Sequence, residues 1–345
     1  MPLFSLEEER MMLRGYLLRR ILTSIFILWV VITLNFVIFR VIHPVGDPSQ
    51  LIIQPGFPPE AREMLREIWG LNQPLFPDQY GKYILNLLTW QYGYTFSTPP
   101  RPIGPEMAWR LRNTLILLGM GLIGTVAIGL PLGVLAGSRR GKKTDVLVMG
   151  AGLLTWGLPS FFLQLLFLLF FAYYSNVWFG FQLMPFGGVM SYPPPKNPII
   201  LVGDVLQHAA GPVITLILIS FGSWALYARN MIIDALTEDF IVTAKAKGLR
   251  ERDVLYKHAF RSILPPIATM IAMAIPGLVT GAIITESIFN WPGIGQWYIA
   301  ALNTGNHPVT QAVLFNFAFL MIIANLLSDV LYGLLDPRIK VGVRR

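Results

Sequence analysis

The chain has 345 residues, of which 54% are hydrophobic and 13% charged, and its formal net charge is +8. Soluble domains carry about 25% charged residues, so this composition excludes an ordinary soluble protein and predicts a polytopic membrane protein. The basic residues are scattered among apolar stretches rather than gathered in a patch of the kind that binds nucleic acid, and there is no cysteine for disulfide or thiol chemistry.

Six stretches are apolar over about 20 residues, the length that crosses a bilayer as a helix. The first follows a charged N-terminal segment, residues 1–17. It is too long for a signal-peptide core and lacks a small-residue cleavage site, so we expect it to stay in the mature protein. The predicted fold is therefore all-α, with six transmembrane helices at residues 18–40, 112–137, 147–173, 209–228, 265–288 and 311–334.

Lysine and arginine residues indicate the orientation of these helices. Most of them lie in alternate connections: the N-terminal segment, SRRGKKTD at residues 138–145, the stretch 229–264 and the tail 335–345. Because cytoplasmic loops are enriched in lysine and arginine, we expect both termini to be cytoplasmic. Residues 41–110 are then external, and within this proline-rich segment EAREMLREIWG (residues 60–70) predicts a short amphipathic helix.

Two glycine patterns match nucleotide-binding motifs by letter only. GMGLIG, residues 119–124, lies inside a predicted span, where small residues let helices approach closely, and the same prediction applies to Gly129, Gly133 and Gly137, and to Gly277 and Gly281. GSRRGKKT, residues 137–144, is one residue short of a phosphate-binding loop and follows a membrane helix instead of a strand. We interpret it as a basic connection, so any ATP-driven work needs a partner protein.

The side chains that could support catalysis are few and dispersed. The four histidines, His43, His208, His258 and His307, show no metal-ligand spacing, so we expect neither a metal site nor a catalytic residue. The ionisable residues near membrane depth all lie close to predicted span ends, where side chains reach the interface. These residues are Arg229, Asp234, Glu286 and Asp329.

The densest run of charge is EDFIVTAKAKGLRERDVLYKHAFR, residues 238–261, which we call the docking segment. It cannot enter the bilayer, because each charge would cost about 2.5 kcal/mol or more there. Its first part predicts a helix with acids at the start and lysines at the end, as the helix dipole favours. Gly248 then predicts a corner before a second helix that aligns Leu255 with Ala259 and Val254 with His258. Physical reasoning alone leaves a protein-docking element and a plain charged loop both open.

Several segments of the chain, in order, resemble one family of membrane proteins. TAKAKGL followed by KHAFRSILPP is similar to the cytoplasmic signature loop of bacterial ABC-importer permeases, in the dipeptide and oligopeptide branch. GYLLRRI, WGLNQPLFPDQYGKYI, PLGVLAG, ESIFNWPGIG and LYGLLDPRIK resemble further landmarks of that branch, in the subunit type with a long first external region. Val242, Thr243 and Ala244 replace the usual Glu-Ala-Ala, and Leu264-Pro265 comes later than in other importers, as in the peptide branch.

The resemblance implies a type I ABC-importer transmembrane fold over residues 111–334, with a coupling loop at 229–264. It implies a permease subunit in the bacterial inner membrane that forms half of a pathway for di- or oligopeptides and is not itself an enzyme. The implied partners are a second permease subunit, two ATP-binding subunits that hold the ATP and magnesium, an external substrate-binding protein and membrane lipid. This chain would then bind no cofactor of its own. The residues implied to dock on an ATP-binding subunit are Asp239, Thr243, Ala244, Lys245, Ala246, Lys247, Gly248, Leu249, Arg250 and Arg252.

ESIFNWPGIG, residues 286–295, is called the mouth segment below. We expect it to form a short element at the external mouth, with Glu286, Asn290, Trp291, Pro292 and Gly293 near the binding protein or the substrate path. Anchoring of Trp291 and Trp297 at the membrane interface is the alternative. For the whole chain, a gradient-driven transporter or channel is the alternative function; the spans carry no ladder of acids and bases to support it.

Overall fold

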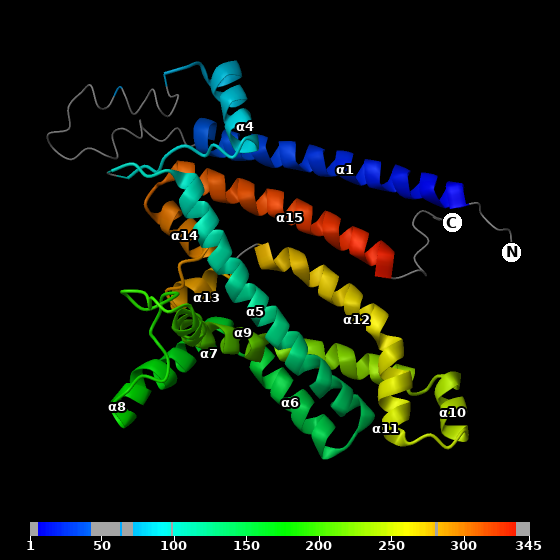
Figure 1. Ribbon diagram of the computed structural model, residues 1–345. Coiled ribbons are helices and arrows are strands. Elements are labelled where there is room, and N and C mark those ends of the chain that lie inside the picture. The colour runs from blue at the N-terminus through cyan, green and yellow to red at the C-terminus, as the bar shows by residue number, and fades with distance from the viewer. Residues whose placement is uncertain (1–5, 43–62, 64–71, 98, 280–281, 336–345) are drawn as a thin grey trace.

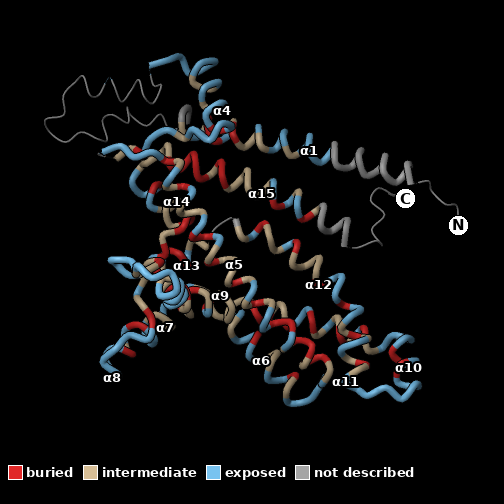
Figure 2. Tube along the Cα trace, in the orientation of Figure 1, coloured by how far each residue is buried: buried red, intermediate tan, exposed pale blue. Residues whose placement is uncertain are grey.

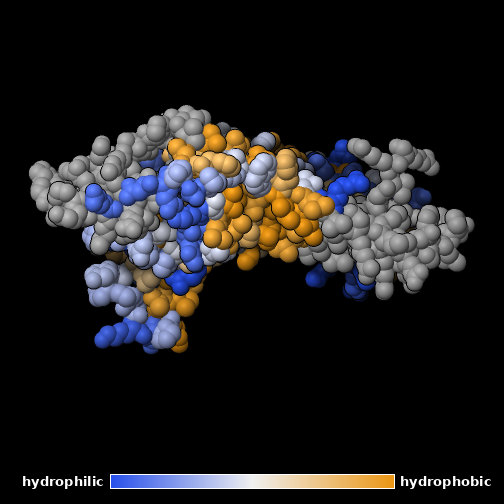
Figure 3. Space-filling view, turned by 90° about the horizontal axis from the view of Figure 1, so that it is seen from above, coloured by the Kyte–Doolittle hydropathy of each residue, from blue (hydrophilic) through white to orange (hydrophobic). Residues whose placement is uncertain are grey.

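The computed structural model describes residues 6–42, 63, 72–97, 99–279 and 282–335. Within these residues, six helices are long and apolar enough to cross a membrane, which confirms the predicted number. A hydrophobic band occupies the middle of the molecule and hydrophilic residues flank it on both sides (Figure 3). This distribution is the one expected where hydrocarbon covers the middle of a helical bundle. The six helices are Arg19–Phe39, Ile103–Ser138, Ser160–Phe179, Pro198–Ala235, Glu251–Leu278 and His307–Asp329.

The helices form one bundle with two distinct ends (Figure 1). α5 packs along α9, α6 also packs on α9, and α15 packs between α1 and α12. α4, α13 and α14 lie toward one end, and α10 and α11 lie at the other. The helices of the first half are α1 (Leu6–Phe36), η1 (Val37–Ile42), η2 (Leu75–Gln79), α4 (Tyr80–Leu88), α5 (Ile103–Ser138), α6 (Lys143–Gly157), α7 (Ser160–Leu168), η3 (Leu169–Tyr174) and α8 (Ser175–Phe179). Those of the second half are α9 (Pro198–Ala235), α10 (Asp239–Ala246), α11 (Glu251–Asp253), η4 (Val254–Ala259), α12 (Phe260–Ala274), η5 (Ile275–Val279), α13 (Ile283–Ile288), α14 (Ile294–Asn303) and α15 (His307–Leu335).

Glycines bring α5 and α9 into close contact. A Cβ atom at Gly133 would lie 2.3 Å from the carbonyl oxygen of Ala225, and one at Gly137 would lie 2.4 Å from Cγ2 of Ile232. The helix-packing prediction is confirmed for these glycines and for Gly129. Within GMGLIG it is confirmed for Gly121 and Gly124, where a Cβ atom would meet Leu216 and Ile217 of α9. It is wrong for Gly119 and Gly277, because a Cβ atom at either would meet nothing within 4 Å. Gly281 lies outside the described residues.

The third predicted span, 147–173, is not one continuous helix. α6 ends at Gly157, and both Leu158 and Pro159 have extended backbone before α7 begins. The residue before a proline is disfavoured in the helical conformation, which accounts for the break at this position. The apolar helix long enough to span is therefore Ser160–Phe179, which ends beyond the predicted boundary.

The fifth predicted span also differs, since the helix is Glu251–Leu278 instead of 265–288. Pro265 and Pro266, expected to open this span, lie inside α12. Their missing N–H groups leave the carbonyls of Arg261 and Ser262 without their usual helical donors. Arg261 and Ser262 are exposed, so water can satisfy these carbonyls. Residues 283–288 form the separate short helix α13.

The ends of the predicted external segment can be compared only in part. α5 begins at Ile103, so residues 103–110 of the segment 41–110 belong to its first turns. The predicted amphipathic helix at 60–70 falls almost entirely outside the described residues, as does the predicted tail 335–345. At the other end of the bundle, the predicted basic connection is a short turn between α5 and α6.

Candidate functional sites at the two ends of the bundle

The first part of the docking segment forms the helix α10, as predicted. Asp239 lies in its first turn and Lys245 in its last turn, so both charges favour the helix dipole. Gly248 follows with a φ of +73°, and its N–H donates a hydrogen bond to the carbonyl of Lys245. This left-handed conformation suits glycine, and it makes the predicted corner.

α10 is packed against the bundle through two side chains. Ile241 and Ala244 are buried in one apolar cluster with Val134 of α5, Ile232 of α9 and Val254 of η4. Burying one face of a short helix in this way holds it at a fixed position, since eight residues form no stable helix alone. The buried side of α10 lies against the helix that continues into α12 (Figure 2), so a movement of α10 would pass first to that helix.

The second predicted helix is the beginning of the fifth span and not a separate piece. α11, η4 and α12 follow one another without interruption from Glu251 to Ala274. η4 is a wide π-type turn, in which residues five apart come to the same side. Val254 and Ala259 are accordingly both buried in the cluster, whereas the predicted pairs were Leu255 with Ala259 and Val254 with His258.

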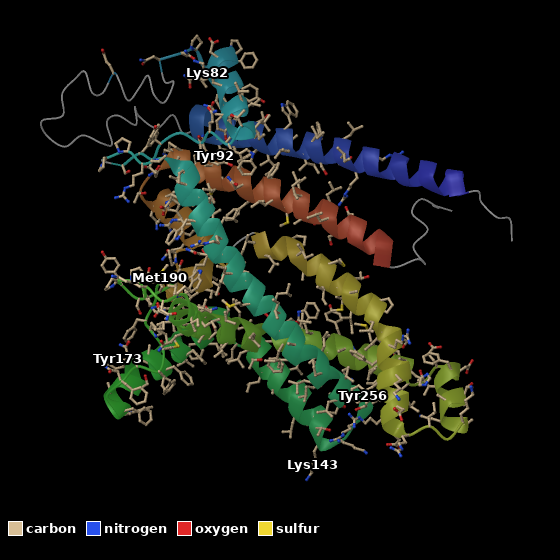
Figure 4. All side chains as sticks on the ribbon, viewed as in Figure 1. Lys82, Tyr92, Lys143, Tyr173, Met190 and Tyr256 are labelled. Carbon is tan, nitrogen blue, oxygen red and sulfur yellow. The ribbon has the colours of Figure 1, made fainter. Side chains whose placement is uncertain are left out.

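Around the Gly248 corner, the face of the docking segment that does not touch the bundle is exposed and mixed in character. Apolar side chains there include Phe240, Val242 at 61% exposed, Leu249 and Tyr256, the last labelled in Figure 4. Ala244 is buried, so its predicted direct contact with a partner is wrong and its role is packing. The other predicted docking residues are exposed: Asp239, Thr243, Lys245, Ala246, Lys247, Gly248, Leu249, Arg250 and Arg252.

A buried ion pair lies at this same end. The Arg229 guanidinium donates hydrogen bonds of 2.6 and 2.8 Å to the two carboxylate oxygens of Asp145. The backbone N–H of Gly141 adds a third hydrogen bond, of 2.8 Å. The hydrogen bond from Arg229 lowers the pKa of Asp145 to about 2. Arg229 was predicted to reach the interface, and sequence spacing gave no signal of this partner. Of the other predicted span-end charges, Asp329 pairs with Arg20 and Asp234 is exposed.

At the opposite end, Glu286 of the mouth segment is fully buried, so the prediction that it reaches the interface is wrong. The Thr114 hydroxyl donates a 2.7 Å hydrogen bond to Oε1 of Glu286, and the backbone N–H of Gln296 donates one of 2.8 Å to Oε2. Burial raises the pKa of Glu286, while these hydrogen bonds oppose that shift. On the other face of α13, Gln164 donates a 2.8 Å hydrogen bond to Thr285. A buried polar network therefore joins α5, α7, α13 and α14.

Trp291 is buried as well, which excludes membrane anchoring for this side chain. Its Nε1 donates a 3.0 Å hydrogen bond to the carbonyl of Asn113, and Asn113 Nδ2 donates one of 3.1 Å to the carbonyl of Pro292. Trp297 is partly buried and lies 5.2 Å from the guanidinium of Arg110. Asn113 and Thr114 were not predicted as functional residues; two adjacent polar side chains at the start of an apolar span were the available signal.

Among the predicted mouth residues, Asn290 is exposed, Pro292 is half-buried, and Glu286, Trp291 and Gly293 are buried. Asn290 has a φ of +44°, a conformation that is strained for most residues other than glycine. Its side-chain oxygen accepts a 2.9 Å hydrogen bond from Gln296, and its carbonyl accepts one of 3.1 Å from Gly188. The mouth segment is therefore a rigid turn that displays Asn290 at the surface.

Comparison with known proteins places this architecture in one family. Residues 129–341 match the family described as the binding-protein-dependent transport system inner membrane component, and residues 12–103 match the N-terminal region of such components. The oligopeptide transport system permease protein AppB of Bacillus subtilis (strain 168) is 32% identical over 94% of this chain and 99% of its own length. The dipeptide transport system permease protein DppB of Escherichia coli (strain K12) is 31% identical over 90% of this chain and 94% of its own length. A putative peptide permease of Brucella ovis is 33% identical over 94% of this chain and 99% of its own length.

Proposed function

The chain belongs to the family of inner membrane components of binding-protein-dependent transport systems, and we propose that it forms half of the translocation pathway of an ABC importer for di- or oligopeptides. As a multi-pass protein of the bacterial inner membrane, it would pair with a second permease subunit. Two ATP-binding subunits would hold the ATP and magnesium, and a binding protein would deliver the peptide from outside. The relatives support the peptide class, because they are named oligopeptide and dipeptide permeases.

The packing of α10 is the observation that carries the mechanism. α10 packs on η4 through buried Ile241 and Ala244, which belong to an apolar cluster that continues to α5 and α9, while its outer side and the Gly248 corner are exposed. An ATP-binding subunit seated on this surface would move α10 as a rigid body when it closes on ATP. Because η4 continues into α12, that movement would pass directly to the fifth span and change the opening of the pathway.

The exposed face of the docking segment suits a protein partner better than water alone. Phe240, Val242, Leu249 and Tyr256 offer apolar area, and Arg250 and Arg252 stand beside them. Aromatic and arginine side chains are enriched at protein interfaces, and the aliphatic side chains add apolar area that a partner can bury. The basic turn between α5 and α6 lies at the same end of the bundle as α10. Cytoplasmic loops are enriched in lysine and arginine, so this end would face the cytoplasm.

The alternative, a gradient-driven transporter, needs ionisable groups that take up and release ions along the pathway. The buried carboxylates Asp145 and Glu286 lie at opposite ends of the bundle, at the start of α6 and in α13 (Figure 1). Each already holds several hydrogen bonds from fixed donors. This arrangement gives the alternative little support, and the importer remains the function that we propose.

ATPase activity of the assembled complex tests the proposal. The chain would be co-expressed with a second permease and ATP-binding subunits from the same organism, and placed in lipid nanodiscs. We expect the complex to co-purify and its ATPase activity to rise when peptide-loaded binding protein is added. A chain that purifies alone, binds no ATP-binding subunit and transports with an ion gradient would contradict the proposal.

Gly248 offers a matched variant within this experiment. Gly248 and Gly180 each follow the end of a helix, have φ values of +73° and +74°, and leave open space around a Cβ atom; Gly180 follows α8, away from α10 (Figure 1). An alanine costs about 1 kcal/mol of backbone strain at either position. We expect Gly248→Ala to weaken coupling of ATPase activity to the binding protein and Gly180→Ala to leave it unchanged. Equal effects of the two variants would argue against a special role for the Gly248 corner.

A further inference from the structure

The first turn of α14 obtains its hydrogen-bond acceptors from outside the helix. Helices begin with N–H groups that have no acceptor within the helix, and here three of them face α5 and α13. The N–H of Ile294 donates a 2.9 Å hydrogen bond to the Thr114 hydroxyl, and that of Gln296 donates to Glu286. The N–H of Gly295 also donates to Glu286. α14 is therefore capped by side chains of two other helices.

Thr114 and Glu286 act together in this cap. The Thr114 hydroxyl accepts from Ile294 and donates to Glu286, so it needs both its lone pair and its proton. The Glu286 carboxylate accepts hydrogen bonds from Thr114, Gly295 and Gln296. It also lies at the positive end of the α14 dipole, which favours its charged form. The backbone passes so close that a Cβ atom at Gly293 would lie 2.2 Å from Cδ of Glu286.

The same cap fixes the mouth segment against α5. Hydrogen bonds from Asn113 to the carbonyl of Pro292 and from Trp291 to the carbonyl of Asn113 flank it on one side. The side chain of Gln296, the third residue of α14, donates to exposed Asn290. A shift at the start of α14 would thus move Asn290 and the surface around it. The position of that surface relative to α5 depends on the contacts of Glu286.

We propose that Glu286 is a positioning residue which, through Thr114 and the first turn of α14, sets the mouth segment in the place where the substrate-loaded binding protein docks. This inference rests on the proposed importer function. It assigns no contact between Glu286 and substrate, because the carboxylate is buried. Its effect reaches the partner through Asn290 and the exposed residues of α14.

Variants of Thr114 and Glu286 in the assembled complex test this role. ATPase activity would be measured against the concentration of peptide-loaded binding protein. We expect Thr114→Val to raise the half-saturating concentration about tenfold, as for loss of a hydrogen bond to a charged group. Basal and maximal ATPase activity should be unchanged, because α10, the proposed contact with the ATP-binding subunits, lies at the other end of the bundle. Thr114→Ser keeps the hydroxyl and should restore the wild-type value.

The double variant of Thr114 and Glu286, and a pair of glycine variants, distinguish this positioning role from a general loss of stability. Thr114→Val combined with Glu286→Gln should be no worse than Glu286→Gln alone, because both interrupt one network. Gly293→Ala should also raise the half-saturating concentration of binding protein. The extended backbone of residue 293 accepts alanine, and the new Cβ atom would displace the carboxylate of Glu286. Gly203→Ala, where a Cβ atom would meet nothing within 4 Å, is the control.

A spectroscopic measurement tests the position of α14 relative to α5 and does not depend on transport activity. The chain has no cysteine, so spin labels can be placed at two exposed positions, Ala300 on α14 and Ile123 on α5. We expect a narrow distance distribution in the otherwise wild-type complex and a broader or shifted one with Thr114→Val.

Unchanged half-saturation and an unchanged distance distribution in Thr114→Val would overturn the inference. So would failure of Thr114→Val to assemble while Thr114→Ser assembles, because the role would then be in folding. If the wild-type complex gives no response to any loaded binding protein, the proposed function itself fails. The spin-label distances would still report on the cap.

Discussion

Asp145 and Arg229 join the first turn of α6 to α9 by two parallel hydrogen bonds of 2.6 and 2.8 Å. The Asp145 side chain is only 6% exposed, and the N–H of Gly141 binds one of its oxygens. This carboxylate therefore ties the basic turn between α5 and α6 to the helix that leads into α10. Bidentate pairs of this kind are the stronger ion pairs in proteins, so the turn is part of the scaffold that supports the docking segment.

We predict that Asp145→Asn lowers the thermal stability of the protein near neutral pH. The variant leaves the guanidinium of Arg229 partly buried without its counter-charge, which costs about 3 kcal/mol. Asp253→Asn is the matched control, because Asp253 forms a surface pair with Lys257 in which both side chains are much more exposed. Exposed pairs contribute about 1 kcal/mol or less. Melting temperatures in detergent or nanodiscs give the comparison.

The stabilisation that Asp145 provides should decrease as the pH falls. Its pKa in the folded protein is about 2, below the ordinary value of about 3.9. The contribution is therefore complete above about pH 4 and is lost as the pH falls toward 2. The difference in melting temperature between wild type and Asp145→Asn should shrink between about pH 4 and 2. A constant difference over that range would show that the pair does not act through the charge of Asp145.

A second prediction concerns the contact between α5 and α9. Gly133→Ala places a methyl group 2.3 Å from the carbonyl oxygen of Ala225 and 2.7 Å from the Cβ atom of Ala228, so the two helices must separate. Overpacking of this kind costs about 1–3 kcal/mol, and we expect a fall in melting temperature of several degrees. Gly119→Ala on the same helix meets open space, and alanine is the better helix former.

The melting temperature should therefore fall with Gly133→Ala and stay the same or rise with Gly119→Ala. Thermal unfolding and the yield of monodisperse protein would measure them side by side. If Gly119→Ala destabilises as much as Gly133→Ala, then backbone freedom, and not the α5–α9 approach, is what these glycines provide.

Much of the fold follows from local sequence, because apolar length determines spans and charge excludes segments from lipid. The number of spans, α10 and the turn at Gly248 were predicted on these grounds, whereas the bounds of the third and fifth spans were not. The break at Leu158-Pro159 was a recognisable proline signal that the apolar run obscured. By contrast, prolines 265 and 266 lie inside a helix, where exposure of Arg261 and Ser262 makes them tolerable; that exposure is known only from the folded structure.

The candidate sites were less predictable than the spans, because their partners are distant in sequence. Glu286 meets Thr114 across 172 positions, and Arg229 meets Asp145 across 84. Sequence spacing identified Glu286, Arg229 and Asp329 as unusual but assigned all of them to the interface. Only the packing of α14 on α5 and α13, and of α6 on α9, determines that Glu286 is buried and that Arg229 is bonded to Asp145.

The last prediction separates docking from folding on α10 itself. The neighbouring residues Ile241 and Val242 differ sharply in exposure: Ile241 is fully buried in the apolar cluster, and Val242 is 61% exposed. Ile241→Asp buries an unpaired carboxylate and should lower the melting temperature of the chain. Val242→Asp leaves that cluster intact and should keep the melting temperature, yet it should abolish co-purification of the ATP-binding subunits, because a desolvated carboxylate in an interface costs several kcal/mol. Retention of those subunits by Val242→Asp at wild-type levels would show that they dock elsewhere on this end of the bundle.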